Sequence, residues 1–151
     1  MITYQQEFLC QTDKAEVMPL LREDWDEIEH PSKRGCDLDP DWDTYEALEG
    51  QGAFKVFTAR EDGELIGYLG VFIAPFLHSK GKLLAMMDAI YVRKDRRNSR
   101  AGVGLIRFTE RCMREDGLTS LCLTSTESYP LGHLFARLGY SPVETRHEKA
   151  L

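Results

Sequence analysis

Apolar residues follow two patterns along the chain: alternating or continuous runs that predict strands, and runs with a period of three to four that predict helices. Asp62-Gly63 lies between two strand-like runs and favours a tight hairpin turn. The strands predicted in this way are Ile2–Leu9 at an edge, Phe54–Arg60, Leu65–Ala74, Leu83–Val92, Leu118–Thr124 and one or two more between Tyr140 and Leu151.

Four helices are predicted from caps and from apolar stripes with helical spacing. The first starts at Asp13. The second follows a loop over Glu29–Asp41, with Asp39 as its cap and Pro40 in its first turn. The fourth is short and covers Leu131–Leu138. The residues predicted to face inward are Met18, Leu21, Trp25 and Ile28 in the first helix, Trp42, Tyr45 and Leu48 in the second, and Leu105, Ile106, Thr109, Cys112 and Met113 in the third.

This order of elements predicts one α/β domain over residues 1–151. A run of strands followed by a strand–helix–strand unit gives a mixed, mostly antiparallel central sheet. We expect six to seven strands, with about four helices on both faces. A chain of this length buries roughly two thirds of its unfolded surface, so its core needs no disulfide or metal to support it.

The composition argues against several classes of protein. The four cysteines are far apart and lack CxxC or Cys/His ligand spacing, so we expect reduced thiols and no metal. No apolar run is long enough to span a membrane, and no secretory leader is recognisable. We therefore expect a cytoplasmic protein with no membrane partner.

The net charge of −6 hides an asymmetry between the two halves of the chain. Residues 1–75 carry 17 acidic and 6 basic residues, a net charge of −11, and residues 76–151 carry 8 acidic and 13 basic ones, a net charge of +5. The basic half suits a polyanionic ligand, and the acidic half would attract a cationic amine. The alternative is that the acidic residues are simply solvated helix faces.

Many of the basic residues lie in a glycine-bearing loop, Arg93–Gly104, between a predicted strand and a predicted helix. Unpaired N–H groups and the helix dipole make such a helix start a site for anions, and Gly102 and Gly104 let the backbone approach a phosphate. The chain has no GxxxxGK(S/T) and no GxGxxG, which excludes a P-loop and argues against a dinucleotide fold. Nucleic acid is disfavoured because Asp95 interrupts the basic run and aromatic residues are not interleaved.

Two motifs resemble those of the GNAT N-acetyltransferases. Ser99–Gly104 resembles the pyrophosphate loop of that family, Arg/Gln-x-x-Gly-x-Gly/Ala, with Ser99 in the first position, where Arg97 could supply the missing side chain. Leu134–Tyr140 resembles the second signature, Leu-Tyr-x-x-x-Gly-Phe/Tyr. The resemblance implies a GNAT-like fold; it covers about Ala53–Leu151 well and the N-terminal third loosely.

The resemblance implies an acetyl-CoA-dependent N-acetyltransferase that moves an acetyl group to a primary amine by direct attack in a ternary complex. The pyrophosphate is then expected on the N–H groups that start the third helix, and the pantetheine arm beside the end of the central strand. The predicted acetyl-CoA-binding residues are Tyr91, Val92, Arg93, Arg97, Ser99, Arg100, Ala101, Gly102, Val103 and Gly104.

Asp88 is the one carboxylate inside the predicted central strand, where burial should raise its pKa. The resemblance implies that it is the general base, acting through water, although a strand aspartate is often only bonded to a neighbour. Phe135 occupies the position that usually carries a Tyr, and it has no proton to give. Tyr129 or Ser128 could act as the acid instead; alternatively the thiolate leaves unassisted, which we rank first.

The departure at Phe135 leaves a second class of function open: a catalytically weak or inactive module that binds acyl-CoA or a protein on the same fold. In the family the N-terminal helices form one wall of the acceptor site, but residues 20–50 do not identify the amine, which is a small molecule or a protein amine. Small acetyltransferase-like proteins of bacteriophages are similar in combining an acidic N-terminus with an arginine-rich loop. A homodimer through the C-terminal strands is compatible with the pattern.

Overall fold

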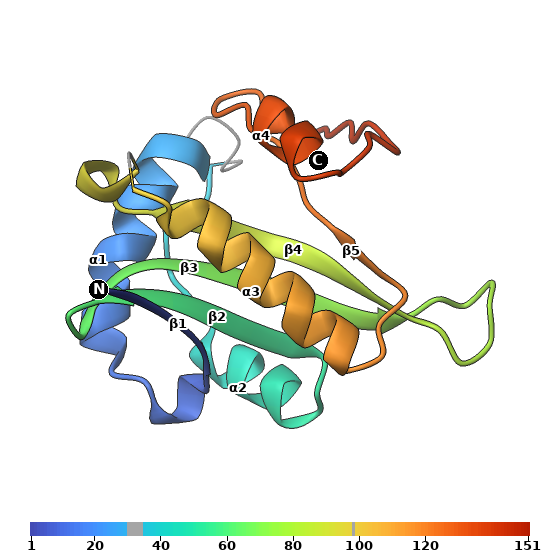
Figure 1. Cartoon of the computed structure of the whole chain (residues 1–151), viewed down its shortest axis with the longest axis horizontal. Helices are drawn as coiled ribbons and strands as arrows, with labels where there is room; N and C mark the ends of the chain where they lie inside the picture. Colours follow the sequence, from blue (N-terminus) through green and yellow to red (C-terminus); the bar gives the residue numbers. More distant parts are fainter. Residues whose placement is uncertain (30–34, 98) are drawn as a thin grey trace.

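Five strands form one mixed sheet in the order β1–β2–β3–β4–β5 (Figure 1). The computed structural model describes residues 1–29, 35–97 and 99–151. Neighbouring strands are antiparallel from β1 to β4, whereas β5 runs parallel to β4. The strands are β1 (Ile2–Glu7), β2 (Phe54–Glu61), β3 (Glu64–Pro75), β4 (Leu83–Val92) and β5 (Ser120–Cys122).

The expectation of six to seven strands is wrong, because no described residue after Cys122 belongs to a strand. The predicted strand or strands over 140–151 are absent for a reason visible in the sequence. Between Ser141 and Lys149 the only apolar side chains are those of Pro142 and Val143, so a strand there would have no apolar face to bury.

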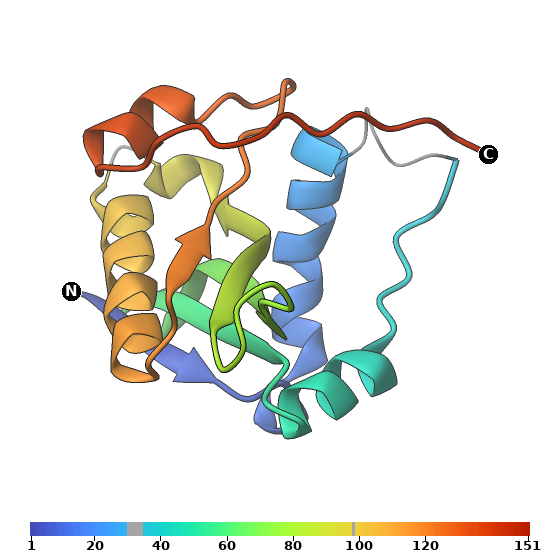
Figure 2. The same ribbon diagram turned by 90° about the vertical axis from the view of Figure 1, so that its right-hand side faces the viewer.

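Helices cover both faces of the sheet, with α1 and α2 on one side and α3 and α4 on the other (Figure 2). The described residues also form three short helical turns, η1 (Leu9–Gln11), the π-helical turn η2 (Trp25–Glu29) and η4 (Lys94–Arg96). Among the described residues no helix has both the length and the apolar character needed to cross a membrane. The helices are α1 (Lys14–Asp24), α2 (Trp42–Gly50), α3 (Ala101–Glu115) and α4 (Gly132–Arg137).

The N-terminal caps explain where the first two helices begin. Asp13 caps α1 as predicted, since its side chain accepts a hydrogen bond from the Ala15 N–H at 2.9 Å. The predicted cap of α2 was wrong by two residues: Asp41, not Asp39, accepts from the Thr44 N–H at 3.0 Å. Of the predicted loop before α2, residues 35–41 contain no helix or strand, and residues 30–34 lie outside the described part of the chain.

Two apolar clusters hold the layers together, one on each face of the sheet. The predicted stripe of α3 is confirmed, with Cys112 at its partly exposed margin. In α1 the inward face is rotated from the prediction, because Leu20 and Asp24 are buried while Met18 is only half-buried. The α3 side is formed mainly by Phe57, Leu69, Leu105, Ile106 and Phe135, and the α1 side by Leu20, Ile28, Leu65, Tyr68 and Tyr91.

The sheet opens at one end because β4 and β5 pair over only three residues. Leu84–Met86 pair with Ser120–Cys122, and β5 then diverges from β4 toward α4 (Figure 1). From Met87 to Val92 no described strand pairs with β4 on that side. The end of β4 therefore presents an unpaired strand edge, which can bind an extended ligand.

The start of α3 lies against β1 through a close approach that only glycine allows. A Cβ at Gly104 would lie 2.1 Å from the Tyr4 hydroxyl oxygen, and this hydroxyl donates a hydrogen bond to the Arg100 carbonyl at 3.4 Å. A Cβ at Gly102 would make only an ordinary contact with Val92, at 3.7 Å. Packing against Tyr4 is therefore reason enough for glycine at position 104.

We predict opposite effects of the same substitution at these two glycines. Gly104→Ala should lower the free energy of unfolding by about 1–3 kcal/mol, because the methyl group overpacks against Tyr4. Gly102→Ala should be neutral or stabilising by up to about 1 kcal/mol, since alanine favours a helix and the site has room. Urea denaturation of the two variants beside the wild type checks this, and equal effects would contradict the packing argument.

Candidate functional site

Asp88 lies at a β-bulge in the middle of β4. Gly70 of β3 pairs with Ala89 and Val71 pairs with Met87, so Asp88 has no partner on β3. Its neighbour Ala89 packs against the apolar cluster on the α1 side, and the Asp88 carboxylate contacts α2 on that same side. A bulge turns two successive side chains to one face in this way and is common next to active sites.

The Asp88 carboxylate accepts a hydrogen bond from the Tyr45 hydroxyl of α2 at 3.1 Å. The Asp88 side chain is exposed at the surface of the sheet, but protein atoms packed around the carboxylate still remove part of its hydration. Burial therefore raises its pKa above the usual value, and the hydrogen bond from Tyr45 opposes part of this rise. The direction agrees with the expectation from the sequence.

A second tyrosine–carboxylate pair lies behind the first. The Tyr68 hydroxyl of β3 donates a hydrogen bond to the buried carboxylate of Asp24 in α1. Burial raises the pKa of Tyr68 well above its usual value, and the negative charges of Asp24 and Asp88 act in the same direction. The α1–α2 side of the sheet therefore holds two acidic side chains close to the β4 bulge.

Tyr91 and Val92 form the end of β4; Tyr91 makes its polar contacts through its side chain, and Val92 through its backbone carbonyl. The Tyr91 side chain is buried toward α1, where its hydroxyl donates to Glu23 and Glu27 at 3.2 and 3.0 Å. The Val92 carbonyl accepts a hydrogen bond from the Arg97 Nε at 2.9 Å. The Val92 carbonyl therefore already has a partner, the side chain of Arg97.

Arg97 joins four segments of the chain at this point. Its guanidinium binds both oxygens of Glu27 in η2, at 2.5 and 2.8 Å. It also lies between two aromatic rings, 5.0 Å from the centre of Tyr91 and 4.9 Å from that of Tyr129. In this arrangement Arg97 is engaged within the protein, and its predicted contact with phosphate stays a prediction.

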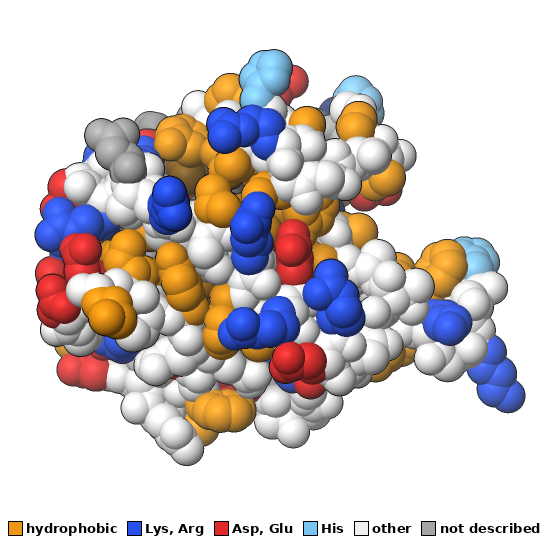
Figure 3. Space-filling model, in the orientation of Figure 1, with side chains coloured by type: hydrophobic (Ala, Val, Ile, Leu, Met, Phe, Trp, Pro, Cys, Tyr) orange, Lys and Arg blue, Asp and Glu red, His pale blue; other side chains and the backbone are white. Residues whose placement is uncertain are grey.

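Acidic residues neutralise most of the basic loop. Arg93 binds Asp95 and Glu64, and Arg96 binds Asp95 and Glu61. Arg100 is exposed and forms no ion pair with a described residue. On the α3 face as a whole, Lys and Arg side chains are interspersed with acidic and hydrophobic ones (Figure 3). The charge available to an anion is therefore concentrated at Arg100 and the start of α3.

The first turn of α3 provides backbone donors beside Arg100. The Ser99 hydroxyl accepts a hydrogen bond from the Ala101 N–H at 3.2 Å, so this donor is satisfied. No described residue accepts from the N–H groups of Gly102 and Val103. Two donors without a described acceptor at a helix start, together with one exposed guanidinium, are the groups that a small anion site needs.

Tyr129 and Asp88 have different contact partners. Tyr129 belongs to the loop between β5 and α4, which is fixed to η2 by a hydrogen bond from the Ser128 hydroxyl to the Ile28 carbonyl at 2.9 Å. Its ring contacts Arg97, whereas Asp88 contacts Tyr45. The two residues predicted as catalytic thus have different polar partners, although Tyr129 packs against the same apolar cluster as Ala89, the neighbour of Asp88.

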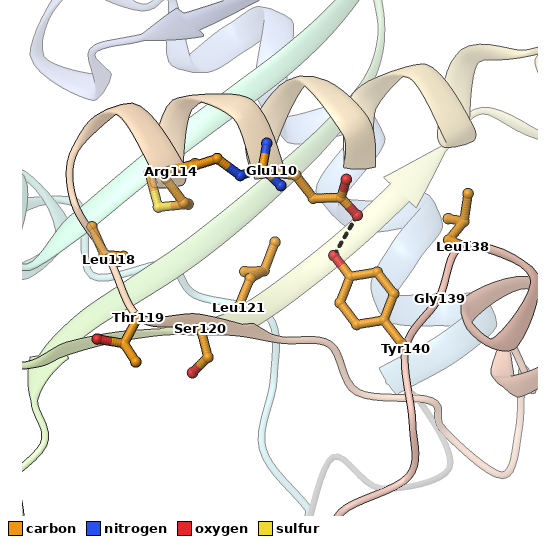
Figure 4. A pocket seen from close by; sticks show the side chains of 10 residues that line it. Glu110, Arg114, Leu118, Thr119, Ser120, Leu121, Leu138, Gly139 and Tyr140 are labelled. Atoms are coloured by element: carbon orange, nitrogen blue, oxygen red, sulfur yellow. Dashed lines mark hydrogen bonds between the residues drawn. The ribbon is translucent and has the colours of Figure 1, made fainter.

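A cavity of about 300 Å³ lies elsewhere, between the second half of α3, β5 and the segment that follows α4 (Figure 4). Glu110 and Tyr140 close one end of it, with the Tyr140 hydroxyl donating at 2.8 Å. None of the predicted site residues lines this cavity. Among the described side chains there is no group of three His, Cys, Asp or Glu residues able to hold a metal ion.

The family model described as the Acetyltransferase (GNAT) family matches residues 17–140. This chain belongs to the GNAT family. The matched residues include the β4 bulge, helix α4 and the loop before α3. The site described above therefore lies within the family domain. No curated protein sequence matches the chain.

Solved GNAT-type structures have the same fold at low sequence identity. An aminoglycoside acetyltransferase from an uncultured soil metagenomic sample, in complex with sisomicin, has a TM-score of 0.75 and 19% identity, with 99% of this chain and 96% of that one covered. A ribosomal-protein-alanine N-acetyltransferase from Brucella melitensis biovar Abortus 2308 gives 0.76 and 20%, with 99% of each chain covered. A predicted acetyltransferase with acetyl-CoA from Clostridium acetobutylicum gives 0.67 and 12%, with 99% and 96% covered.

Phe135, which stands where the family motif usually has a tyrosine, lacks a hydroxyl and is also part of the apolar core. Phe135 is buried in the core on the α3 side and packs against the Tyr140 ring, with 6.0 Å between ring centres. Sequence reasoning missed Tyr45 and Glu27 as site residues. The available signal was that a buried tyrosine needs a partner for its hydroxyl; nothing comparable pointed to Glu27.

Glu27 should make stability depend on pH in a defined range. The hydrogen bonds from Arg97 lower its pKa from 4.5 to about 2. A carboxylate with a lowered pKa stabilises the fold above its unfolded value and loses this contribution as the pH falls to its folded value. Glu27→Gln should therefore lower the free energy of unfolding at pH 7, and this deficit should shrink from about pH 4.5 toward pH 2.

Urea denaturation at several pH values measures this difference. Glu144→Gln is a matched control, since Glu144 is exposed and forms no ion pair with the described residues. A deficit for Glu27→Gln that stays constant down to pH 2 would show that the ion pair with Arg97 is not its cause.

Proposed function

We propose that this GNAT protein transfers an acetyl group from acetyl-CoA to a primary amine by direct attack in a ternary complex. The observation that supports this best is the strand–loop–helix unit formed by β4, Arg93–Arg100 and α3. It combines an unpaired strand edge with a helix start that binds anions, which are the two features that an extended, phosphorylated thioester needs.

The residues present fit acetyl-CoA. The N–H groups of Gly102 and Val103, which have no acceptor among the described residues, and the exposed guanidinium of Arg100 would hold the pyrophosphate. The unpaired edge of β4 near Val92 would pair with the pantetheine amides. Bound acetyl-CoA supplies the activated acyl group, and the chain supplies its position. Arg97 would bind a phosphate only after its ion pair with Glu27 had broken.

Asp88 would act as the general base. An alkyl amine with a pKa near 10.4 is neutral in only about one molecule in a few thousand at pH 7, so the attacking amine must lose a proton. A carboxylate with a raised pKa at the β4 bulge is suited to take that proton, directly or through water. A backbone N–H at the end of β4 would polarise the thioester carbonyl.

The leaving thiolate has no evident proton donor at the expected position. Phe135 has no hydroxyl, and the predicted substitute Tyr129 lies against Arg97. With a reference pKa near 8.5, a thiolate can leave without a general acid. We therefore keep unassisted departure as the first choice and Tyr129 as the second.

The acceptor is proposed only as a class, a cationic amine. The solved relatives named above act, by their descriptions, on an aminoglycoside and on a ribosomal protein. Here the α1–α2 side of the sheet places Asp24 and Asp88 near the bulge, and carboxylates would attract such an amine. A catalytically weak acyl-CoA-binding module is the second candidate, favoured by the absence of a hydroxyl at Phe135.

Gly102→Asp tests the cofactor site. The added carboxylate should abolish coenzyme A binding in calorimetric titration, because it places negative charge where the pyrophosphate would lie. The fold should survive, since position 102 has room for a Cβ and an acidic residue at a helix start is favourable. Gly102→Asn has the same shape without the charge and serves as the control. Normal binding by Gly102→Asp would exclude this placement.

Asp88→Asn separates the two candidate functions. If the protein is an acetyltransferase, turnover should fall about 10²-fold or more while coenzyme A affinity changes little, because only the base is lost. Release of free thiol from acetyl-CoA in the presence of a panel of primary amines measures this. A wild-type protein that binds acetyl-CoA but acetylates no amine in the panel would favour the binding module.

A further inference from the structure

Tyr45 provides the hydrogen bond that orients the Asp88 carboxylate. We propose that Tyr45 is a positioning residue for acetyl transfer, holding Asp88 with one oxygen occupied and the other ready to accept the proton of the attacking amine. This inference rests on the proposed function. It concerns a residue of α2, outside the cofactor loop and β4.

The position of the Tyr45 hydroxyl is fixed by a row of aromatic rings. The Tyr45 ring lies 4.9 Å from Phe54, which lies 5.0 Å from Phe72, and Trp42 packs on its other side at 6.3 Å. Gly70 makes this row possible, because a Cβ there would come within 3.0 Å of the Phe54 ring. Gly70 also lies opposite the β4 bulge, so the Phe54 ring and Asp88 meet β3 at the same residue.

The helix that carries Tyr45 is itself anchored at several points. Glu46 forms an ion pair with Lys14 of α1 at 2.7 Å, and Glu49 accepts the Leu9 N–H at 2.9 and 3.0 Å. The Lys14 ammonium also lies 5.4 Å from the centre of the Trp42 ring. Tyr45 therefore reaches Asp88 from a fixed support, as expected of a group that orients a catalytic side chain.

The other groups around the carboxylate leave this role to Tyr45. Tyr45 reaches it from α2, while Tyr68 from β3 faces it but donates its proton to Asp24 of α1. Only Oδ2 of Asp88 has a hydrogen-bond donor among the described residues, so Oδ1 is available to a substrate or a water. In the reaction the amine proton moves to Oδ1, and Tyr45 keeps its own proton.

The hydrogen bond also offsets burial. Burial alone favours the protonated, inactive form of Asp88, whereas a donor on Oδ2 favours the carboxylate. Without the hydroxyl, Asp88 would be protonated up to a higher pH and free to rotate. If the bond only tied α2 to the sheet and Asp88 took no part in proton transfer, its loss would not move the pH dependence of the reaction.

The experiment compares wild type, Tyr45→Phe, Asp88→Asn and the double variant in thiol release from acetyl-CoA with 1-aminopropane, from pH 5 to 9. We expect Tyr45→Phe to move the acid limb of kcat to higher pH and to lower kcat about tenfold on that limb, with KM for acetyl-CoA unchanged. In the Asp88→Asn background the same change should have no further effect, because the hydroxyl then has no carboxylate to orient.

Tyr140→Phe is the matched control, since it removes a hydroxyl bound to Glu110 far from the bulge. It should leave the pH profile in place. Equal effects of Tyr45→Phe with and without Asp88, or an unmoved acid limb, would overturn the proposal.

A second measurement does not depend on turnover. Carbon-13 NMR of the Asp88 carboxylate, assigned by its loss in Asp88→Asn, should show a higher pKa in Tyr45→Phe than in the wild type. An unchanged pKa would overturn the proposal even if the protein is an acetyltransferase. A raised pKa of Asp88 in Tyr45→Phe, in a protein that acetylates no amine, would support the contact between Tyr45 and Asp88 and contradict the proposed function.

Discussion

The three residue pairs that join β5 to β4 are the constraint on which the site depends. If the pairing continued past Met86, the end of β4 would be an interior strand with all of its backbone groups occupied. Because β5 leaves after Cys122, β4 has a free edge beside the bulge at Asp88 and the loop to α3. The chemistry proposed here uses all three features, and the free edge is a direct result of where β4 and β5 separate.

The distribution of charge also shapes the site, but the charges of the two halves of the chain do not form two separate surfaces, as the composition suggests. The acidic N-terminal half and the basic C-terminal half look like two surfaces for two partners. In the structure they largely neutralise each other, since Glu27, Glu61 and Glu64 bind arginines of the loop before α3. What remains for an anionic ligand in this loop is the exposed guanidinium of Arg100 beside the start of α3. A phosphate that recruited Arg97 would have to displace Glu27, which also bonds Tyr91.

Periodicity predicted β2, β3, β4 and α3 well because each has a continuous apolar pattern and a clear end, such as the turn at Asp62-Gly63. It predicted too many strands, because a signature at Gly139-Tyr140 says nothing about the polar residues that follow. The loop before α3 could be proposed as a cofactor site from its glycines and arginines, since this information is local, and that role stays a prediction. The Tyr45–Asp88 and Arg97–Glu27 contacts join residues 43 and 70 positions apart, and no local pattern encodes them.

The order of strands in the sheet also has a consequence for how the chain folds. β2, β3 and β4 follow one another directly, so their contacts close short loops and can form early. β1 pairs Ile2 with Glu61, and this contact must wait until two helices and a long connection have been made. During synthesis β1 therefore leaves the ribosome well before its partner β2. Its polar composition, with Gln5, Gln6 and Glu7, suits a segment that has to stay soluble while it waits.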